Sequence, residues 1–383
     1  MIARPRALAR IDEALRRHPV AALLGARQSG KTTLARMIAA RGPCEFFDLE
    51  DPVDLRRLSA PMTTLERLSG LIIIDEVQRR PDLFELVRVL ADRPDAATRF
   101  LLLGSASPRI VRGASESLAG RIGFIDLSGL DLRETGVEQR DRLWVRGGFP
   151  RSFLADDDRA SLAWREAFIR TFLERDIPQL GITIPAETLR RFWTMVAHFH
   201  GQVWNAAQFA RSISASENTA RSYLDILAGA FMVRVLPPWY ENIGKRQVKS
   251  PKVYLRDTGV LHALLHIGTL ADLEGHPKLG ASWEGFAIEQ VVTLLETRDA
   301  YFWSTHGGAE LDLLVTIGGK RYGFEFKYED APGLSRSMRV AREDLRLEHV
   351  WVVYPGREDY ALDASASVIS IHRVPELTGR ADL

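Results

Sequence analysis

The sequence has little cysteine, and it lacks long hydrophobic runs. Cys44 is the one cysteine among 383 residues, which excludes a disulfide framework and a thiolate metal cluster. Its neighbours are typical of strand core, so we interpret it as a small buried apolar residue. No apolar run approaches the ~20 residues that a membrane-spanning helix needs, and the N-terminus lacks the apolar segment of a signal peptide. We therefore expect a cytoplasmic protein with no membrane partner.

Lysine is also scarce, and charge of either sign is not in excess. The net charge is +1, with 46% hydrophobic and 26% charged residues, which is ordinary for a soluble globular protein. Such a balance gives no overall attraction to nucleic acid or membrane, so any basic surface must be local. Three of the seven lysines, Lys245, Lys249 and Lys252, lie within eight residues. The length is enough for two or three domains.

A glycine-rich pattern is present near the N-terminus. Residues 25–32 have the spacing G-x-x-x-x-G-K-[ST] of a phosphate-binding loop, between an apolar run at 20–24 and a helical pattern at 33–40. Glycines let the backbone N–H groups point inward, and the helix N-terminus adds positive charge. We expect Lys31 to bridge the β- and γ-phosphates of ATP, and Thr32 to hold Mg²⁺. The expected ATP-binding residues are Gly25, Gln28, Ser29, Gly30, Lys31, Thr32 and Thr33.

Two acidic residues follow the next clear strand. Residues 71–74 are all aliphatic and run into Asp75 and Glu76, as a central parallel strand delivers carboxylates to the ligand-binding edge of a sheet. This is a Walker B pattern. We expect Asp75 to hold Mg²⁺ through its water shell, and Glu76 to orient and deprotonate the attacking water. The alternative is a solvated pair that caps the next helix.

Three more residues are candidates for the catalytic machinery. The strand at 100–103 runs into Gly104 and Ser105, which places Ser105 to sense the γ-phosphate. The alternative for Ser105, and more so for Ser107, is a helix N-cap with no catalytic role. Arg121 follows a short helix and a glycine turn, and we interpret it either as an arginine finger acting on a nucleotide bound by a neighbouring subunit or as a surface arginine. The first interpretation implies a homo-oligomer.

The middle of the chain has helical and then mixed patterns. Helical spacing dominates residues 151–200, and a helix at 205–213, a turn and a second helix ending at Gly229 predict a helix-turn-helix. With strands at 231–236 and 252–255, the segment is typical of a winged helix. The loop between these strands is basic and could contact DNA phosphates, although a solvated or interdomain loop is the alternative. Its basic residues are Lys245, Arg246, Lys249 and Lys252.

The C-terminal part returns to an α/β pattern. A helix at 282–292 precedes strands at 300–303, 310–315 and 322–327, the last two joined by a glycine hairpin. The two-residue period puts Glu325 and Lys327 on one face, with Asp312 on the adjacent strand. Carboxylates on adjacent strands, such as Asp312 and Glu325, raise one another's pKa or need a cation between them. The alternative is an exposed strand face with alternating charges.

Together these motifs resemble one family, the prokaryotic ATP-binding proteins of the AAA superfamily that carry a C-terminal domain of unknown function. The resemblance covers nearly the whole chain and implies ATP binding and hydrolysis. Its residues are 25–32, Asp75 with Glu76, Gly104 with Ser105, 117–121 and 147–150.

The last domain also resembles the restriction-endonuclease-like nuclease core, although no proline precedes the aspartate. The resemblance implies that Asp312, Glu325 and the helix acid Glu284 are metal ligands and that Lys327 is catalytic. Glu289 is the rival for the helix acid. The two glutamates lie about 140° apart around a helix, so they cannot both face one metal.

We therefore predict an α/β protein with a P-loop NTPase parallel sheet, a helical and winged-helix segment, and an α/β restriction-endonuclease-like domain. The predicted function is Mg²⁺-dependent ATP binding and hydrolysis, acting on or with DNA, with nuclease activity left open. The alternative is a nucleotide-dependent switch or scaffold whose C-terminal domain binds without catalysis. The predicted domains are an AAA-type ATPase at 1–150, a helical segment at 151–200, a winged helix at 201–270 and a nuclease-like domain at 271–383.

Overall fold

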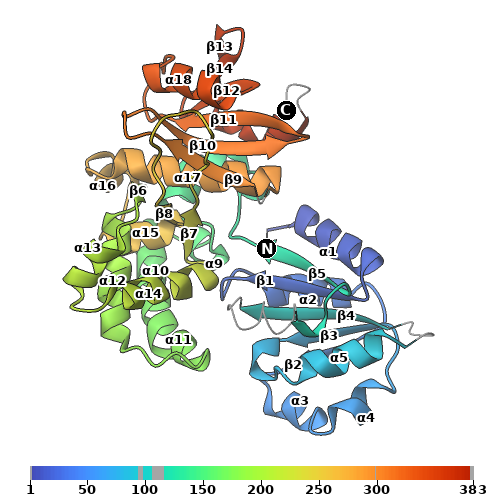
Figure 1. Ribbon diagram of the computed structural model, residues 1–383. Coiled ribbons are helices and arrows are strands. Elements are labelled where there is room, and N and C mark those ends of the chain that lie inside the picture. The colour runs from blue at the N-terminus through green and yellow to red at the C-terminus, as the bar shows by residue number, and fades with distance from the viewer. Residues whose placement is uncertain (1, 94–97, 106–115, 298, 380–383) are drawn as a thin grey trace. The chain divides into compact units, whose positions relative to one another are not determined.

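The chain folds into two compact units in the computed structural model (Figure 1). The structure describes residues 2–93, 98–105, 116–297 and 299–379, so Ser107 lies outside the described residues. The first unit comprises residues 1–129 with 229–231, and the second comprises 130–228 with 232–383. The finer division into four domains stays a prediction.

A five-stranded parallel sheet in the order β2-β3-β4-β1-β5 forms the centre of the first unit. The continuous aliphatic runs produce it, because parallel strands are covered on both faces and need apolar residues at every position. β1 is buried along its whole length. The strands are β1 (Val20–Gly25), β2 (Cys44–Asp48), β3 (Leu71–Asp75), β4 (Arg99–Ser105) and β5 (Ile122–Leu127).

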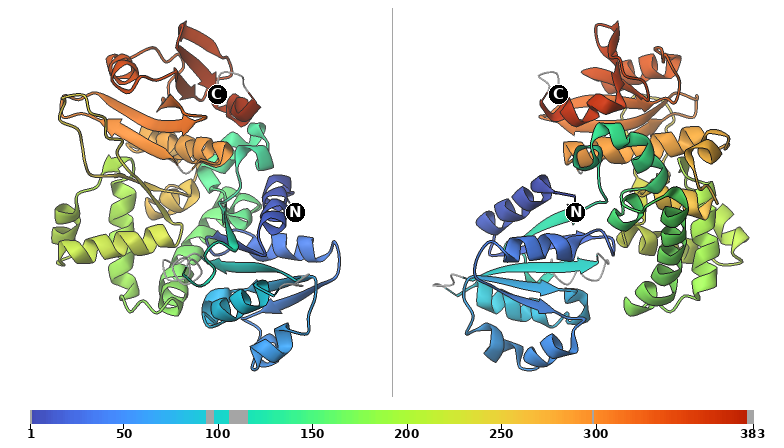
Figure 2. Two further views of the ribbon diagram at one scale, coloured as in Figure 1. Left: turned by 45° about the vertical axis from the view of Figure 1, so that its right-hand side comes forward. Right: turned by 180° about the vertical axis from the view of Figure 1, so that it is seen from behind.

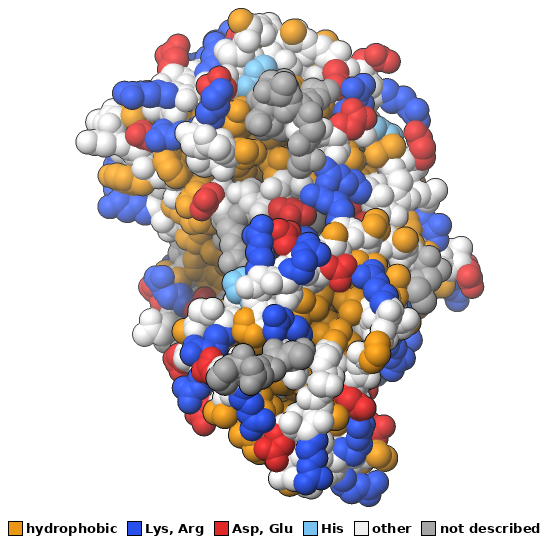
Figure 3. Space-filling model, turned by 90° about the vertical axis from the view of Figure 1, so that its right-hand side faces the viewer, with side chains coloured by type: hydrophobic (Ala, Val, Ile, Leu, Met, Phe, Trp, Pro, Cys, Tyr) orange, Lys and Arg blue, Asp and Glu red, His pale blue; other side chains and the backbone are white. Residues whose placement is uncertain are grey.

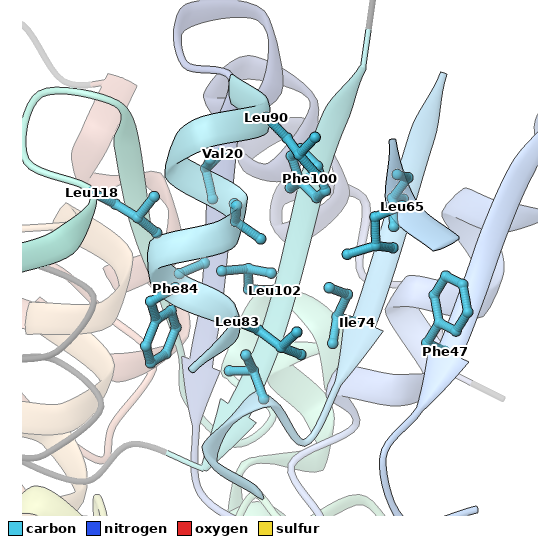
Figure 4. Close-up of a cluster of buried hydrophobic side chains, with 14 of the residues drawn as sticks. Val20, Phe47, Leu65, Ile74, Leu83, Phe84, Leu90, Phe100, Leu102 and Leu118 are labelled. Atoms are coloured by element: carbon cyan, nitrogen blue, oxygen red, sulfur yellow. The ribbon is translucent and has the colours of Figure 1, made fainter. Parts of the chain in front are cut away.

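Helices cover both faces of this sheet. Alternate residues of β3 serve the two sides: Ile73 packs with residues of α1 and α2, whereas Ile72 and Ile74 pack with residues of α4 and α5. Figure 4 shows the second cluster, and Figure 2 shows the sheet from two further directions. The helices are α1 (Pro5–Arg17), α2 (Lys31–Ala39), α3 (Pro52–Arg57), α4 (Pro61–Leu65) and α5 (Leu83–Ala91), with a 3₁₀ turn η1 (Val77–Arg79).

The first part of the second unit is helical, and its later part contains both strands and helices. Within the described ranges, no helix is long and apolar enough to cross a membrane. The 3₁₀ segments are η2 (Val137–Gln139) and η4 (Ile371–Gly379), and η3 (Phe172–Asp176) is a π-helical segment. The helices are α7 (Leu132–Thr135), α8 (Arg140–Arg146), α9 (Pro150–Phe153), α10 (Asp158–Thr171), α11 (Ile177–Gln179), α12 (Ala186–His198), α13 (Ala206–Ser212), α14 (Glu217–Gly229), α15 (Thr258–Leu264), α16 (Leu270–Glu274), α17 (Leu279–Leu295) and α18 (Arg336–Leu345).

Two sheets complete the second unit. A three-stranded antiparallel sheet has the order β6-β8-β7, and a mixed six-stranded sheet has the order β13-β14-β12-β11-β10-β9. Helix α18 packs on one face of the larger sheet, and α17 contacts β11. The strands are β6 (Gln202–Val203), β7 (Val233–Leu236), β8 (Lys252–Leu255), β9 (Ala300–Ser304), β10 (Glu310–Ile317), β11 (Lys320–Phe326), β12 (His349–Tyr354), β13 (Tyr360–Asp363) and β14 (Ala366–Ser370).

The predicted fold class is confirmed: a parallel N-terminal sheet is followed by helical and mixed-sheet segments. The helix-turn-helix order of α13 and α14 is also observed. β7 begins at Val233, two residues later than predicted, and the short strand β6 was not predicted. The names winged helix and restriction-endonuclease-like stay predictions.

Candidate functional site

The glycine-rich loop connects β1 to the N-terminus of α2, as the sequence predicts. Its two glycines are required for different reasons. Gly30 has φ +99°, a left-handed conformation that side chains rarely adopt. A Cβ added to Gly25 would lie 2.4 Å from the carbonyl oxygen of Leu127, so the close approach of β5 leaves no room for one.

Polar groups inside this loop fit a phosphate. Ser29 is fully buried, and its Oγ has no hydrogen-bond partner among the described residues. Lys31 is also buried, and its ammonium donates to the carbonyl oxygens of Gly25 (3.1 Å) and Ala26 (2.9 Å). An unpartnered hydroxyl, an ammonium and a helix N-terminus in one place suit the oxygens of a nucleotide phosphate. Gln28 has φ +63° within the loop, and Thr33 lies in the first turn of α2.

Thr32 and Asp75 are brought together from the loop and from the end of β3. The Thr32 hydroxyl donates to Asp75 Oδ2 at 2.6 Å. Asp75 is only 2% exposed, and this burial raises the pKa of its carboxyl group. A hydroxyl and a carboxylate at this distance fit the ligand set of Mg²⁺, which binds through one or two protein oxygens and retained waters.

Glu76 and Ser105 are connected by a residue that sequence reasoning missed. The side-chain amide of Gln78, in η1, donates to the Glu76 carboxylate and to Ser105 Oγ, the latter at 3.1 Å. Glu76 itself has φ +56°, a left-handed conformation that is uncommon for a non-glycine residue. The available signal was a glutamine two residues after the acidic pair. This glutamine can reach Ser105 only because β4 ends beside η1, which the local sequence does not indicate.

Arg4 also supports the loop without belonging to any motif. Its guanidinium donates to the carbonyl oxygens of Ser29 (3.1 Å), Ser128 (3.2 Å) and Gly129 (3.1 Å). The side chain is buried where α1 begins. Arg4 therefore ties the loop to the segment that follows β5, and nothing in the local sequence indicates this.

Arg121 lies at the opposite ends of the strands from the nucleotide loop. It directly precedes β5, and its carbonyl oxygen accepts a hydrogen bond from Val20, the first residue of β1. The nucleotide loop follows the last residue of β1. Arg121 also pairs with Asp92. It is therefore remote from the loop of its own chain, and action on a neighbouring subunit's nucleotide stays a prediction.

A second group of predicted residues meets in the six-stranded sheet. Glu284 from α17, Asp312 from β10, and Glu325 from β11 lie in one cluster. Asp312 Oδ2 accepts a hydrogen bond of 3.1 Å from the Phe326 N–H, and Lys327 Nζ lies 3.0 Å from Glu325 Oε2. The period-two argument thus placed these side chains on the correct faces.

Lys252 has a different environment from the one expected of a residue of the basic loop. It begins β8, which is the predicted strand at 252–255, but it is only 3% exposed. Its ammonium is 3.2 Å from Glu284, 2.5 Å from Glu310 and 3.7 Å from Asp312. Contact of Lys252 with DNA phosphate is therefore wrong for this structure, because the charge faces the carboxylates inside the unit.

The remaining basic-loop residues are at the surface. Lys245 donates to both carboxylate oxygens of Asp344 at 2.8 and 2.6 Å, and Arg246 and Lys249 are exposed. On the face shown in Figure 3, Lys and Arg side chains are interspersed with Asp and Glu side chains.

Burial and charge shift the pKa values in the cluster. Burial, with the charge of Asp312, raises the pKa of Glu284 to about 7 and the pKa of Glu325 well above its usual range. For Lys252, burial alone would lower the pKa, but the carboxylates around it raise the pKa well above its usual range. The ammonium is thus held charged.

Glu289 has a different environment from its rival Glu284. Arg234 donates to it at 2.9 Å, and Arg256 lies 3.4 Å from it. Burial opposes ionisation, yet these two guanidinium groups lower the pKa of Glu289. The side chain is occupied by an ion-pair network, so Glu284 is the acid of α17 that joins the cluster.

Parts of this chain are similar in sequence to known protein families. The family described as AAA domain matches residues 17–136, and two domains of unknown function, DUF8612 and DUF4143, match residues 137–271 and 279–374. Uncharacterized proteins of Mycobacterium bovis and Mycobacterium tuberculosis are each 54% identical over 371 residues, which covers 97% of this chain and 84% of each relative. The chain belongs to their family.

A solved structure supports the fold of the chain. The Walker-type ATPase of Pyrococcus abyssi superposes with a TM-score of 0.50 at 14% identity, covering 69% of this chain and 96% of that one. With the AAA-domain match over residues 17–136, this confirms the predicted P-loop NTPase fold.

Proposed function

We propose that the first unit binds ATP together with Mg²⁺ and hydrolyses it. The observation that carries this proposal is the 2.6 Å hydrogen bond between Thr32 and Asp75, because it joins the two residues that would hold the ion. The chemistry that Mg²⁺ supplies in such sites is neutralisation of phosphate charge. Lys31 would bind the β- and γ-phosphates from the loop.

Glu76 and its neighbours supply the hydrolytic groups in this proposal. Glu76 would orient the attacking water and accept its proton, as in-line phosphoryl transfer requires. Gln78 donates to Glu76 and to Ser105, so it would hold the base and link it to the serine that senses the γ-phosphate. Each group lies at the carboxyl ends of β3 and β4, the edge where ligands bind in open α/β sheets.

We further propose that the ATP cycle acts on or with DNA through the second unit. The exposed Arg246 and Lys249, with Lys245, would contact phosphates, and α13 and α14 have the helix-turn-helix order. The second candidate function is a nucleotide-dependent switch or scaffold whose C-terminal domain binds without catalysis. The burial of Lys252 among carboxylates favours it, because that arrangement needs no metal.

Phosphate release from the full chain tests the first proposal. We expect release with ATP and Mg²⁺, loss of release on chelation, and loss of ATP binding in Lys31→Ala. Lys320→Ala is the matched control, since Lys320 is an exposed lysine of β11. Release that persists in Lys31→Ala would contradict the proposed site.

DNA affinity and particle size test the second proposal. We expect the double variant Arg246→Ala, Lys249→Ala to bind DNA more weakly than wild type and with a smaller salt dependence. If the C-terminal domain only binds, plasmid should stay uncut with wild type and with Asp312→Ala. A change of particle size with ATP and Mg²⁺ that is lost in Arg121→Ala would support a homo-oligomer with a finger in trans.

A further inference from the structure

Lys252 is an unusual residue because it is a buried lysine amid three acidic side chains. Although Lys252 belongs to β8 of the smaller sheet, its ammonium contacts Glu284 of α17 and Glu310 and Asp312 of β10. The Tyr254 hydroxyl, from the same strand, donates to Glu284 at 2.5 Å. The ammonium also lies 5.6 Å from the centroid of the Phe302 ring, within reach of a cation–π interaction.

Carboxylates this close, with Glu284 and Asp312 largely shielded from water, require a cation or a proton. Like charges at short range in a low-dielectric site repel strongly unless one is protonated or a positive charge lies between them. A divalent metal is one solution, and it is the solution that a metal-dependent nuclease uses. A lysine ammonium is another, because it offers three N–H donors to the same oxygens.

Several of the oxygens that a metal would need are already engaged. Asp312 Oδ1 faces Lys252, and Asp312 Oδ2 accepts from the Phe326 backbone. Glu325 Oε2 pairs with Lys327. In the part of the chain that the structure describes, no group of three or more His, Cys, Asp or Glu side chains is arranged to hold a metal ion. The residue types of the predicted metal site are thus present, but their placement fits the ammonium.

We propose that Lys252 is the resident cation of this carboxylate cluster, in place of a divalent metal. The cluster then holds β8 to α17 and β10, and it does not support metal-dependent cleavage of nucleic acid. Lys252 is a positioning residue in this account. The inference does not depend on ATP hydrolysis, because the cluster and the nucleotide loop belong to different units.

Lys327 provides the matched comparison, since it is the other lysine in the cluster. Its side chain is 38% exposed, against 4% for the side chain of Lys252. Its Nζ contacts Glu325 of β11, a carboxylate that is not among the three around Lys252. Removing the Lys327 charge should therefore leave the contacts between Lys252 and its three carboxylates in place.

Binding of Mn²⁺ to the full chain without nucleotide tests the proposal. Free Mn²⁺ is counted by its electron paramagnetic resonance signal in wild type, Asp312→Asn, Lys252→Met, Lys327→Met and the double variant Lys252→Met, Asp312→Asn. Any weak binding at the nucleotide loop is common to all five proteins and cancels in the comparison.

We expect wild type, Asp312→Asn and Lys327→Met to bind equally. Lys252→Met should gain one Mn²⁺ per chain with at least tenfold higher affinity, and the double variant should lose it. A site in wild type that Asp312→Asn abolishes would overturn the proposal, and this arm remains decisive even if Lys252→Met fails to fold. A folded Lys252→Met chain that gains no Mn²⁺ would also overturn it.

Discussion

The hydroxyl of Thr32 and the carboxylate of Asp75 lie 2.6 Å apart, although 43 residues separate them in the chain. The parallel order of the sheet explains this contact. β1 and β3 lie on either side of β4, so the loop after β1 and the carboxyl end of β3 meet at one edge. The contact joins a loop that fits phosphate to a buried acid that favours a cation.

Asp75→Asn should separate metal binding from phosphate binding. The substitution keeps the shape of the side chain and removes its charge, so we expect Mg²⁺ affinity of the nucleotide complex to fall on the order of 10- to 100-fold. ATP affinity in the presence of a chelator should change little, because Lys31 and the loop remain. Titration of a fluorescent ATP analogue with and without Mg²⁺ measures both quantities.

Asp82→Asn is the control for this experiment. Asp82 is exposed and pairs with Arg80 at the surface, seven residues after Asp75. It should show the Mg²⁺ dependence of wild type. An Asp75→Asn protein whose nucleotide affinity responds to Mg²⁺ as wild type does would show that Asp75 does not serve the ion.

Gln78→Ala should lower kcat with little effect on KM. Gln78 contacts the Glu76 carboxylate and Ser105, and loss of a hydrogen bond to a charged group weakens its positioning by about 1.5–3 kcal/mol. That corresponds to a roughly 10- to 100-fold lower rate. Steady-state phosphate release gives the kcat and KM values.

Arg79→Ala provides the comparison for Gln78→Ala, since Arg79 is the exposed neighbour in the same 3₁₀ turn. A purely structural role for Gln78 predicts parallel losses in both kcat and the midpoint of thermal unfolding. A positioning role predicts a lower kcat with an unchanged unfolding midpoint.

Stability of the second unit should fall as pH drops below about 6.5 because of His262. Burial lowers the pKa of His262 to about 3, whereas the unfolded chain binds the proton near pH 6.5. The unfolded state therefore binds more protons between these values, so the stability that is present above pH 6.5 is lost as pH falls, by ~1.4 kcal/mol per pH unit for this residue.

Burial keeps His262 neutral, although its contact with the Val145 carbonyl by itself would raise the pKa of the ring. Its Nδ1 lies 3.0 Å from the Val145 carbonyl oxygen and its Nε2 lies 2.7 Å from Ser282 Oγ. Urea unfolding followed by tryptophan fluorescence at pH 7.5 and 5.0 measures the slope. His262→Gln should reduce it, whereas the exposed His306→Gln should not. Equal slopes in wild type and His262→Gln would contradict this assignment.

Much of the first unit could be predicted from local pattern. The loop at 25–32 and the aliphatic run before Asp75 carry their meaning within a few residues, since a strand, a loop and a helix N-terminus are contiguous in the chain. The pairing of β10 with β11 was equally local, because the hairpin fixes the register and hence the shared face of Asp312 and Glu325.

Contacts between distant segments could not be predicted in the same way. Arg4, Gln78 and Lys252 belong to no motif, and each acquires its role from elements that lie far away in sequence. Lys252 shows this most clearly, because its neighbours in the chain suggested an exposed basic loop. The register of β8 turns its side chain toward α17 and β10 instead.

Single-turnover hydrolysis by wild type and Glu76→Gln tests the central claim, that the first unit hydrolyses ATP with Glu76 as the base. The full chain is loaded with radiolabelled ATP, Mg²⁺ is added, and the fraction converted to ADP is followed with time. We predict conversion by wild type, and a rate on the order of 100-fold lower in Glu76→Gln while ATP remains bound. Equal rates in the two proteins, or no conversion by wild type, would contradict the account.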